Sequence, residues 1–97
     1  MLTGIELIAR ERDRQIKVKG WTDSGDDRYE NEELASAAMC YAAPDSLKLL
    51  RQPSKIPLYW PWAEKWWKPS PEDRIRDLEK AGALIAAEID RLLRVRK

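Results

Sequence analysis

The chain has 97 residues, of which 43% are hydrophobic and 36% are charged, and its 18 Lys and Arg nearly balance its 17 Asp and Glu. This length suits one small domain with a modest core, and the composition excludes a disordered tail. A net charge of +1 creates no long-range field that would recruit a polyanion, so the composition disfavours nucleic acid as a partner.

The sequence also bears on the compartment. No apolar run approaches the roughly 20 residues that span a bilayer, and the first residues lack the apolar core of a signal peptide. We therefore expect a cytoplasmic protein without a membrane partner. The only cysteine, Cys40, excludes a disulfide within the chain and lies among alanines. Its thiol is expected to be a small buried apolar group rather than a nucleophile.

The sequence predicts an all-α protein whose first helix covers residues 4–19. Thr3 and Glu6 have the spacing of a capping box, in which each side chain accepts a hydrogen bond from the other residue's backbone. Gly20 follows as a residue that readily adopts the left-handed conformation at a helix end. Spacings of three and four residues predict a stripe that faces the core. The stripe consists of Ile5, Ile8, Ala9, Arg12 and Ile16.

A second helix is expected at residues 32–43, after an acidic loop over 21–30 that is anchored by Trp21. Asn31 is its predicted N-cap, and the acids at positions 32 and 33 suit the positive end of a helix dipole. The many alanines of this helix allow another helix to approach closely. We therefore expect it to be the most buried helix of a small bundle.

The second half of the chain is predicted to hold a short helix near 45–51 and then a Trp- and Pro-rich loop at 52–69, where prolines prevent a long helix. The last helix is expected at 71–95, with Ser70 as its N-cap and a proline in its first position. Three main helices then form a single helical domain over residues 1–97.

The last helix carries apolar residues at alternating spacings of three and four, which is the pattern of a heptad seam. The seam consists of Ile75, Leu78, Gly82, Ile85, Ile89 and Leu92. Gly82 lowers the helix propensity by about 1 kcal/mol, which close packing against the alanine-rich helix would offset. The pattern leaves open whether the seam packs within one chain or between two chains, so a homodimer stays an open alternative.

Four of the five tryptophans lie within "YWPWAEKWWKP", residues 59–69. Each indole can bury about 150–250 Å², so Trp60, Trp62 and Trp66 are expected to fold over the helices as a lid. Neighbours on a helical turn lie about 100° apart, so Trp66 and Trp67 cannot both face inwards, and we expect Trp67 to be accessible. Tryptophan and tyrosine dominate binding hot spots. The predicted partner-binding residues are Tyr59, Trp60, Trp62, Lys65, Trp66 and Trp67.

Acidic residues that could hold a cation fall into two groups, and oxygen ligands of this kind suit Mg²⁺ or Mn²⁺. The groups are Asp26, Asp27, Glu30, Glu32 and Glu33 in the first half of the chain and Asp73, Asp77 and Glu79 on the last helix. Acids in first turns also cap helices, and acids on an outer face confer solubility. On that simpler interpretation the chain has no catalytic residue, metal ligand or cofactor.

A longer pattern, ER-x-RQ…GWT…DD…DL-x-KAGALI-x-AEI-x-RL, resembles small phage and prophage proteins of uncharacterised function. It is carried by Glu11, Arg12, Arg14, Gln15, Gly20, Trp21, Thr22, Asp26, Asp27, Asp77, Leu78 and residues 80–92. The resemblance covers most of the chain. It implies an accessory phage gene whose product works in the host cytoplasm.

The order of these elements is also similar to MazG-like all-α nucleoside triphosphate pyrophosphohydrolases, which bind Mg²⁺ through E-E-x-x-E and E-x-x-D patterns. Glu32 and Glu33 match the first pair, and Asp77 stands on the last helix. Ser36 and Lys80 occupy positions where that family has acids, so the resemblance implies a degraded metal site.

Two functions follow as hypotheses. The first is a non-catalytic phage accessory protein that binds a host or phage protein through its tryptophan loop, and inhibition of a defence protein fits this role. The second is a diverged Mg²⁺-dependent hydrolase, which requires Glu32, Glu33 and Asp77 to converge. A third, binding of single-stranded nucleic acid, needs the tryptophans and the basic C-terminal residues on one face.

Overall fold

The structure is a computed structural model that describes residues 1–44, 46–47 and 56–96. Its helical elements are α1 (Gly4–Lys17), α2 (Asp23–Asp26), α3 (Glu33–Ala42), the 3-10 turn η2 (Glu64–Trp66) and α4 (Arg74–Val95). The described residues contain no strand, which confirms the predicted all-α class with three main helices. Most of the short helix expected near 45–51 falls outside the described residues.

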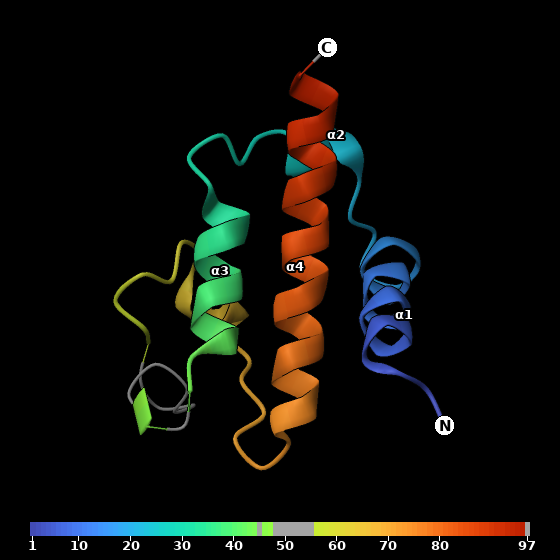
Figure 1. The fold of residues 1–97 in the computed structure, drawn as a ribbon. Coiled ribbons are helices and arrows are strands. Elements are labelled where there is room, and N and C mark those ends of the chain that lie inside the picture. The colour runs from blue at the N-terminus through green and yellow to red at the C-terminus, as the bar shows by residue number, and fades with distance from the viewer. Residues whose placement is uncertain (45, 48–55, 97) are drawn as a thin grey trace.

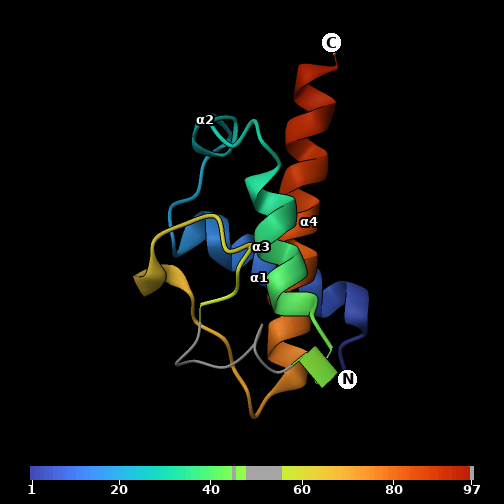
Figure 2. The ribbon, with the colours of Figure 1, turned by 90° about the vertical axis from the view of Figure 1, so that its left-hand side faces the viewer.

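The central element is α4, and the other helices pack around it (Figure 1). α3 lies beside α4 and runs antiparallel to it, whereas α1 lies on another side and crosses α4 at a steep angle, as Figure 2 shows from the side. Both α1 and α3 therefore take most of their helix contacts from α4. None of the described helices combines the length and the apolar character needed to cross a bilayer.

The start of α1 is confirmed, but its predicted core stripe is wrong. Thr3 and Glu6 form the predicted capping box, in which the Thr3 backbone N–H donates to Glu6 Oε1 at 2.8 Å. Ile5 and Ile16 of the stripe are exposed, with 82% and 46% of their surfaces accessible. The face that α1 buries carries Glu11 instead, because guanidinium groups on the neighbouring turn and on α4 satisfy its carboxylate.

The segment between α1 and α3 differs from the prediction in two ways. It contains the one-turn helix α2, which is capped by the side chain of Thr22. The N-cap of α3 is Glu32 rather than Asn31, and it adopts a left-handed φ of 62° without a side-chain capping bond. The Asn31 backbone N–H, which lies before the helix, donates to Glu33 Oε1 at 2.8 Å, so Asn31 is tied to the first turn through its backbone and not as a side-chain cap.

The start of α4 also lies later than predicted. Asp73 is the N-cap, and its carboxylate accepts a hydrogen bond from the Arg76 backbone N–H at 3.2 Å. Ser70 instead uses its own backbone N–H, which donates to the buried carboxylate of Asp77 at 2.8 Å. An aspartate one residue before the helix thus replaces the predicted serine.

The core lies between α3, α4 and the Trp-rich loop, which confirms that the alanine-rich helix is buried. Its members are Leu34, Ala37, Ala38, Cys40, Tyr41, Trp67, Ala81, Leu84 and Ala87. Burial raises the pKa of the Cys40 thiol to about 11, so this side chain is the inert apolar group that its neighbours indicate. Arg74 of α4 donates to the carbonyls of Tyr41 and Ala42 at 3.1 and 2.6 Å and so closes the C-terminal end of α3.

The heptad seam of α4 does not face this core, and Gly82 does not pack against the alanine-rich helix as predicted. Ile75, Leu78, Ile85, Ile89 and Leu92 are all exposed. Gly82 makes a close contact within the chain, and its neighbour is Ile8 of α1. The face that α3 covers is carried by smaller residues of α4, since alanines there allow the two helices to approach closely.

Candidate binding site

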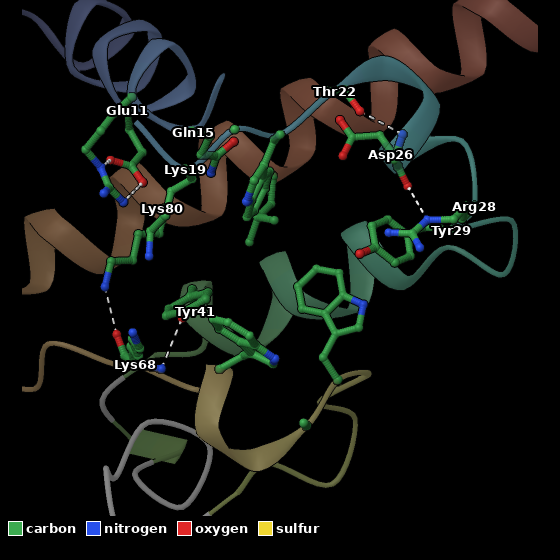
Figure 3. Close-up of a pocket in the computed structure, with 18 of the residues that line it drawn as sticks. Glu11, Gln15, Lys19, Thr22, Asp26, Arg28, Tyr29, Tyr41, Lys68 and Lys80 are labelled. Carbon is green, nitrogen blue, oxygen red and sulfur yellow. Dashed lines mark hydrogen bonds and ion pairs between the residues drawn. The ribbon is translucent and has the colours of Figure 1, made fainter. Parts of the chain in front are cut away.

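A cavity of about 700 Å³ lies between the helices and the Trp-rich loop (Figure 3). Its aromatic lining comes from Trp21, Tyr29, Tyr41, Trp60, Trp62 and Trp66. Its charged lining comes from the cations Arg14, Lys19, Arg28, Lys68 and Lys80 and the acids Glu11 and Asp26. Five cations against two acids make this a locally positive site on a nearly neutral chain.

The aromatic wall is one connected cluster centred on Trp60. The ring centroid of Trp60 lies 5.7 Å from that of Tyr41, 5.4 Å from that of Trp62 and 5.0 Å from that of Trp67. Trp62 continues the cluster to Tyr29 at 5.2 Å. Edge-to-face and tilted contacts at these distances are favourable, so the rings hold one another in place.

One ring of this wall keeps an unsatisfied donor. The Nε1 atom of Trp62 is buried and has no hydrogen-bond partner among the described residues. Buried donors without an acceptor are rare in folded proteins and often mark a place where a ligand or water completes the structure. The indole N–H of Trp60, by contrast, donates to the Ala63 carbonyl at 3.1 Å.

Both acids of the lining are already bound by arginines. Burial alone would raise the pKa of Glu11, but hydrogen bonds from Arg14 at 2.8 Å and Arg76 at 2.7 Å outweigh it and lower the pKa. Burial raises the pKa of Asp26, although Arg12 lies 3.3 Å away and opposes this shift. These carboxylates are therefore already paired within the fold.

Lys19, Arg28, Lys68 and Lys80 form no ion pair with any acid in the part of the chain that the structure describes. Figure 3 places Lys68 and Lys80 on one side of the cavity and Arg28 on the opposite side. The Lys80 ammonium donates to the Lys68 carbonyl at 2.7 Å and lies 5.4 Å from the centre of the Tyr41 ring. Burial lowers the pKa of Lys80, as it disfavours the charged form.

The structure corrects the expected exposure of the tryptophans. Trp67 is only 5% exposed, so the prediction that it is the accessible ring is wrong. It packs on Tyr41, with 4.8 Å between the ring centroids. Trp66 is 51% exposed and does not close the lid. η2 ends at Trp66, and Trp67 follows in an extended conformation that turns its own side chain inwards.

The remaining predicted binding residues divide between wall and rim. Trp60 and Trp62 are half-buried in the wall, whereas Tyr59 is 59% exposed. Lys65 is exposed, and its ammonium lies 5.1 Å from the centre of the Trp66 ring. Accessible aromatic surface is therefore present in residues 59–69, on Tyr59 as expected and on Trp66 in place of Trp67.

The carboxylates required by the hydrolase hypothesis do not come together. Glu32 and Glu33 lie at the start of α3, and Asp77 lies in the first turn of α4. Because α3 and α4 are antiparallel, the two glutamates and Asp77 lie at opposite ends of this helix pair (Figure 1). Among the described residues, no group of three or more His, Cys, Asp or Glu side chains is placed to hold a metal ion.

The cations of the cavity and the contributions of Trp21 and Tyr29 to its wall were not predicted from the sequence. These residues come from α1, the segments around α2, α4 and the Trp-rich loop, so no local spacing groups them. Comparison of the chain with protein-family models, with curated protein sequences and with solved structures finds no match.

Proposed function

We propose that this protein is a non-catalytic accessory protein of phage or prophage origin that binds a host or phage protein. One observation supports the binding role: a cavity walled by mutually packed aromatic rings and bordered by four cations that form no ion pair with a described acid. The phage origin rests on the sequence resemblance alone. The separation of Glu33 from Asp77 gives the hydrolase alternative no support.

The chemistry of the lining defines the kind of segment that would bind. Indole and phenol faces accept an apolar or aromatic side chain, and a volume of about 700 Å³ accommodates such an anchor with its neighbours. The surrounding Lys and Arg attract carboxylates. The expected partner segment therefore presents one apolar anchor side chain flanked by Asp or Glu.

The exposed residues of the rim extend this surface. Trp66 has two cations near its ring, since the ammonium groups of Lys65 and Lys68 lie 5.1 and 5.8 Å from the ring centre. Such a ring can stack on a partner while the lysines reach acids on either side. The rim then contributes specificity, and the cavity binds the anchor side chain of the partner.

The proposal is tested by selecting peptides from a random display library on the intact protein and synthesising those that are enriched. We expect them to share an apolar anchor flanked by acids and to bind more weakly as the salt concentration rises. Affinity is measured by fluorescence anisotropy of labelled peptides. Lys19→Glu and Arg28→Glu should each weaken binding about tenfold or more, since they reverse charges at the rim.

The matched control is Arg10→Glu, which makes the same charge change at an exposed position of α1 outside the cavity. It should leave peptide affinity within about twofold of the unchanged protein, because rim charges act over short distances in salt. Enriched peptides without acids, or equal losses in the control and rim variants, would contradict the proposal.

A further inference from the structure

α4 carries a second apolar face that no described element covers. Its residues Ile75, Leu78, Ile85, Ile89 and Leu92 are between 42% and 61% exposed, and we call this face the α4 stripe. Figure 2 shows α4 on one side of the molecule and the Trp-rich loop on the other. A helix that is apolar on two faces needs a partner for the second one.

The stripe is continuous although it includes a glycine. A Cβ atom at Gly82 would lie 2.5 Å from Cδ1 of Ile8, so the side chain of Ile8 occupies the place that a larger residue at position 82 would fill. Ile8 is itself partly exposed. α1 therefore supplies the missing apolar group, and the stripe extends unbroken along about five turns of α4.

The spacing of the stripe makes it complementary to itself. In an antiparallel pair of heptad helices, each a position lies against a d position of the other helix. With a twofold axis between residues 83 and 84, Ile75 of one copy meets Leu92 of the other and Leu78 meets Ile89. The central layer places Ile85 against the Gly82–Ile8 contact. Every residue of the stripe then has a counterpart, as an isologous interface requires.

The charges at the two ends of α4 select the antiparallel orientation. Glu72 precedes the helix and Arg96 follows it; both are exposed and neither forms an ion pair with a described residue. An antiparallel pair places Arg96 of each copy beside Glu72 of the other. A parallel pair would instead bring the Arg-rich ends together, which costs affinity.

From this pattern we propose that two copies of the chain associate through their α4 stripes as an antiparallel, twofold-symmetric dimer. One stripe is about 25 Å long and one helix wide, so the interface is at the small end of the stable range and a micromolar dissociation constant follows. The dimer leaves the cavity free, because the residues of α4 that line the cavity, Lys80 and Leu84, lie on a different face from the stripe.

The dimer is tested by sedimentation equilibrium of the full chain from low to several hundred micromolar. We expect a reversible monomer–dimer equilibrium, and Ile85→Glu should raise the dissociation constant at least about tenfold by placing a charge in the central layer. Val18→Glu is the control, because it changes an equally apolar residue that is 73% exposed and lies outside the stripe. Circular dichroism verifies that both variants stay folded.

Orientation is tested by oxidative cross-linking, which the buried Cys40 does not disturb. A mixture of Ile75→Cys and Leu92→Cys chains should form disulfide-linked heterodimers, whereas Leu92→Cys alone should stay largely unlinked. A protein that is monomeric at every concentration, an Ile85→Glu variant that dimerises as well as the unchanged chain, or efficient linking of Leu92→Cys to itself would overturn the proposal. Peptide binding at the cavity is measured separately, so either proposal can fail without the other.

Discussion

Glu11 shows how a single polar residue determines the face that a helix buries. The residue is 3% exposed, yet its carboxylate receives hydrogen bonds from Arg14 on its own helix and from Arg76 on α4. The Arg76 guanidinium also reaches Glu79 at 3.2 Å. Hydrophobic spacing predicts that Ile5 and Ile16 point inwards, but a buried ion network with every partner in place overrides that pattern.

The Glu11 network makes stability depend on pH in a defined direction. A carboxyl whose pKa is lowered in the folded state stabilises it fully above the ordinary value of 4.5, and this contribution is lost as the pH falls through the folded pKa. Glu11→Gln removes the charge at constant size and should lower the free energy of unfolding at pH 7 by about 1–2 kcal/mol, since its arginine partners are partly solvated.

Urea unfolding at pH 7 and at pH 3 measures this effect, and the difference between Glu11→Gln and the unchanged protein should shrink at pH 3. Glu30→Gln is the matched control at an exposed position. It should change the free energy of unfolding by less than about 0.5 kcal/mol at either pH. A Glu11→Gln deficit of equal size at both pH values would show that packing rather than charge is lost.

At the scale of the elements, the contact of α1 with α4 depends on the absence of a side chain at residue 82. Three side-chain atoms of Ile8 lie within 3.2 Å of where a Cβ on Gly82 would be. Alanine at this position would favour the helix by about 1 kcal/mol. The overlap with a β-branched side chain that is stiff at χ1 should cost more than that gain.

A double-mutant cycle resolves the two contributions. We expect Gly82→Ala to destabilise the protein by about 1–2 kcal/mol alone and to become neutral or stabilising in an Ile8→Ala background. Urea unfolding at low protein concentration provides the free energies without a contribution from association. Additive effects of the two substitutions would mean that α1 moves aside freely and that the close contact is unimportant.

The helices themselves were predictable, whereas their ends and faces were only partly so. The capping box at Thr3 is a local signal, and it was confirmed. The predicted caps Asn31 and Ser70 were wrong, because tertiary contacts and neighbouring acids decided which side chain meets the first turn. The α4 heptads left open whether the seam packs within one chain or between two, and the structure leaves the seam exposed while Ala81, Leu84 and Ala87 face the core.

At the scale of the whole molecule, the aromatic cluster connects the tryptophan loop to α3 and α4. Trp67→Ala should lower the free energy of unfolding by about 3–5 kcal/mol, because the ring is buried between Tyr41 and Trp60. Trp66→Ala is its natural control, one residue away and half exposed, and it should cost less than about 1 kcal/mol. Thermal unfolding followed by circular dichroism ranks the two variants, and the reverse order would contradict the structure.

The sequence revealed where the aromatic surface of the candidate site is concentrated, but not the chemistry around it. Composition and prolines are local features, so residues 59–69 could be identified directly. The surrounding cations are contributed by segments as distant as Lys19 and Lys80, and the chain as a whole is almost neutral. Only the fold brings them together, because α4 holds α1 and α3 on two of its sides.

The position of α4 in the chain has a consequence for biosynthesis. α1 and α3 are translated first, yet each packs mainly against α4, which is translated after them. The carbonyls at the end of α3 likewise have their hydrogen-bond donor, Arg74, on α4. Short isolated helices are marginal in water. No part of the nascent chain can therefore form a stable packed unit before α4 is synthesised, and folding on the ribosome should be a single late event.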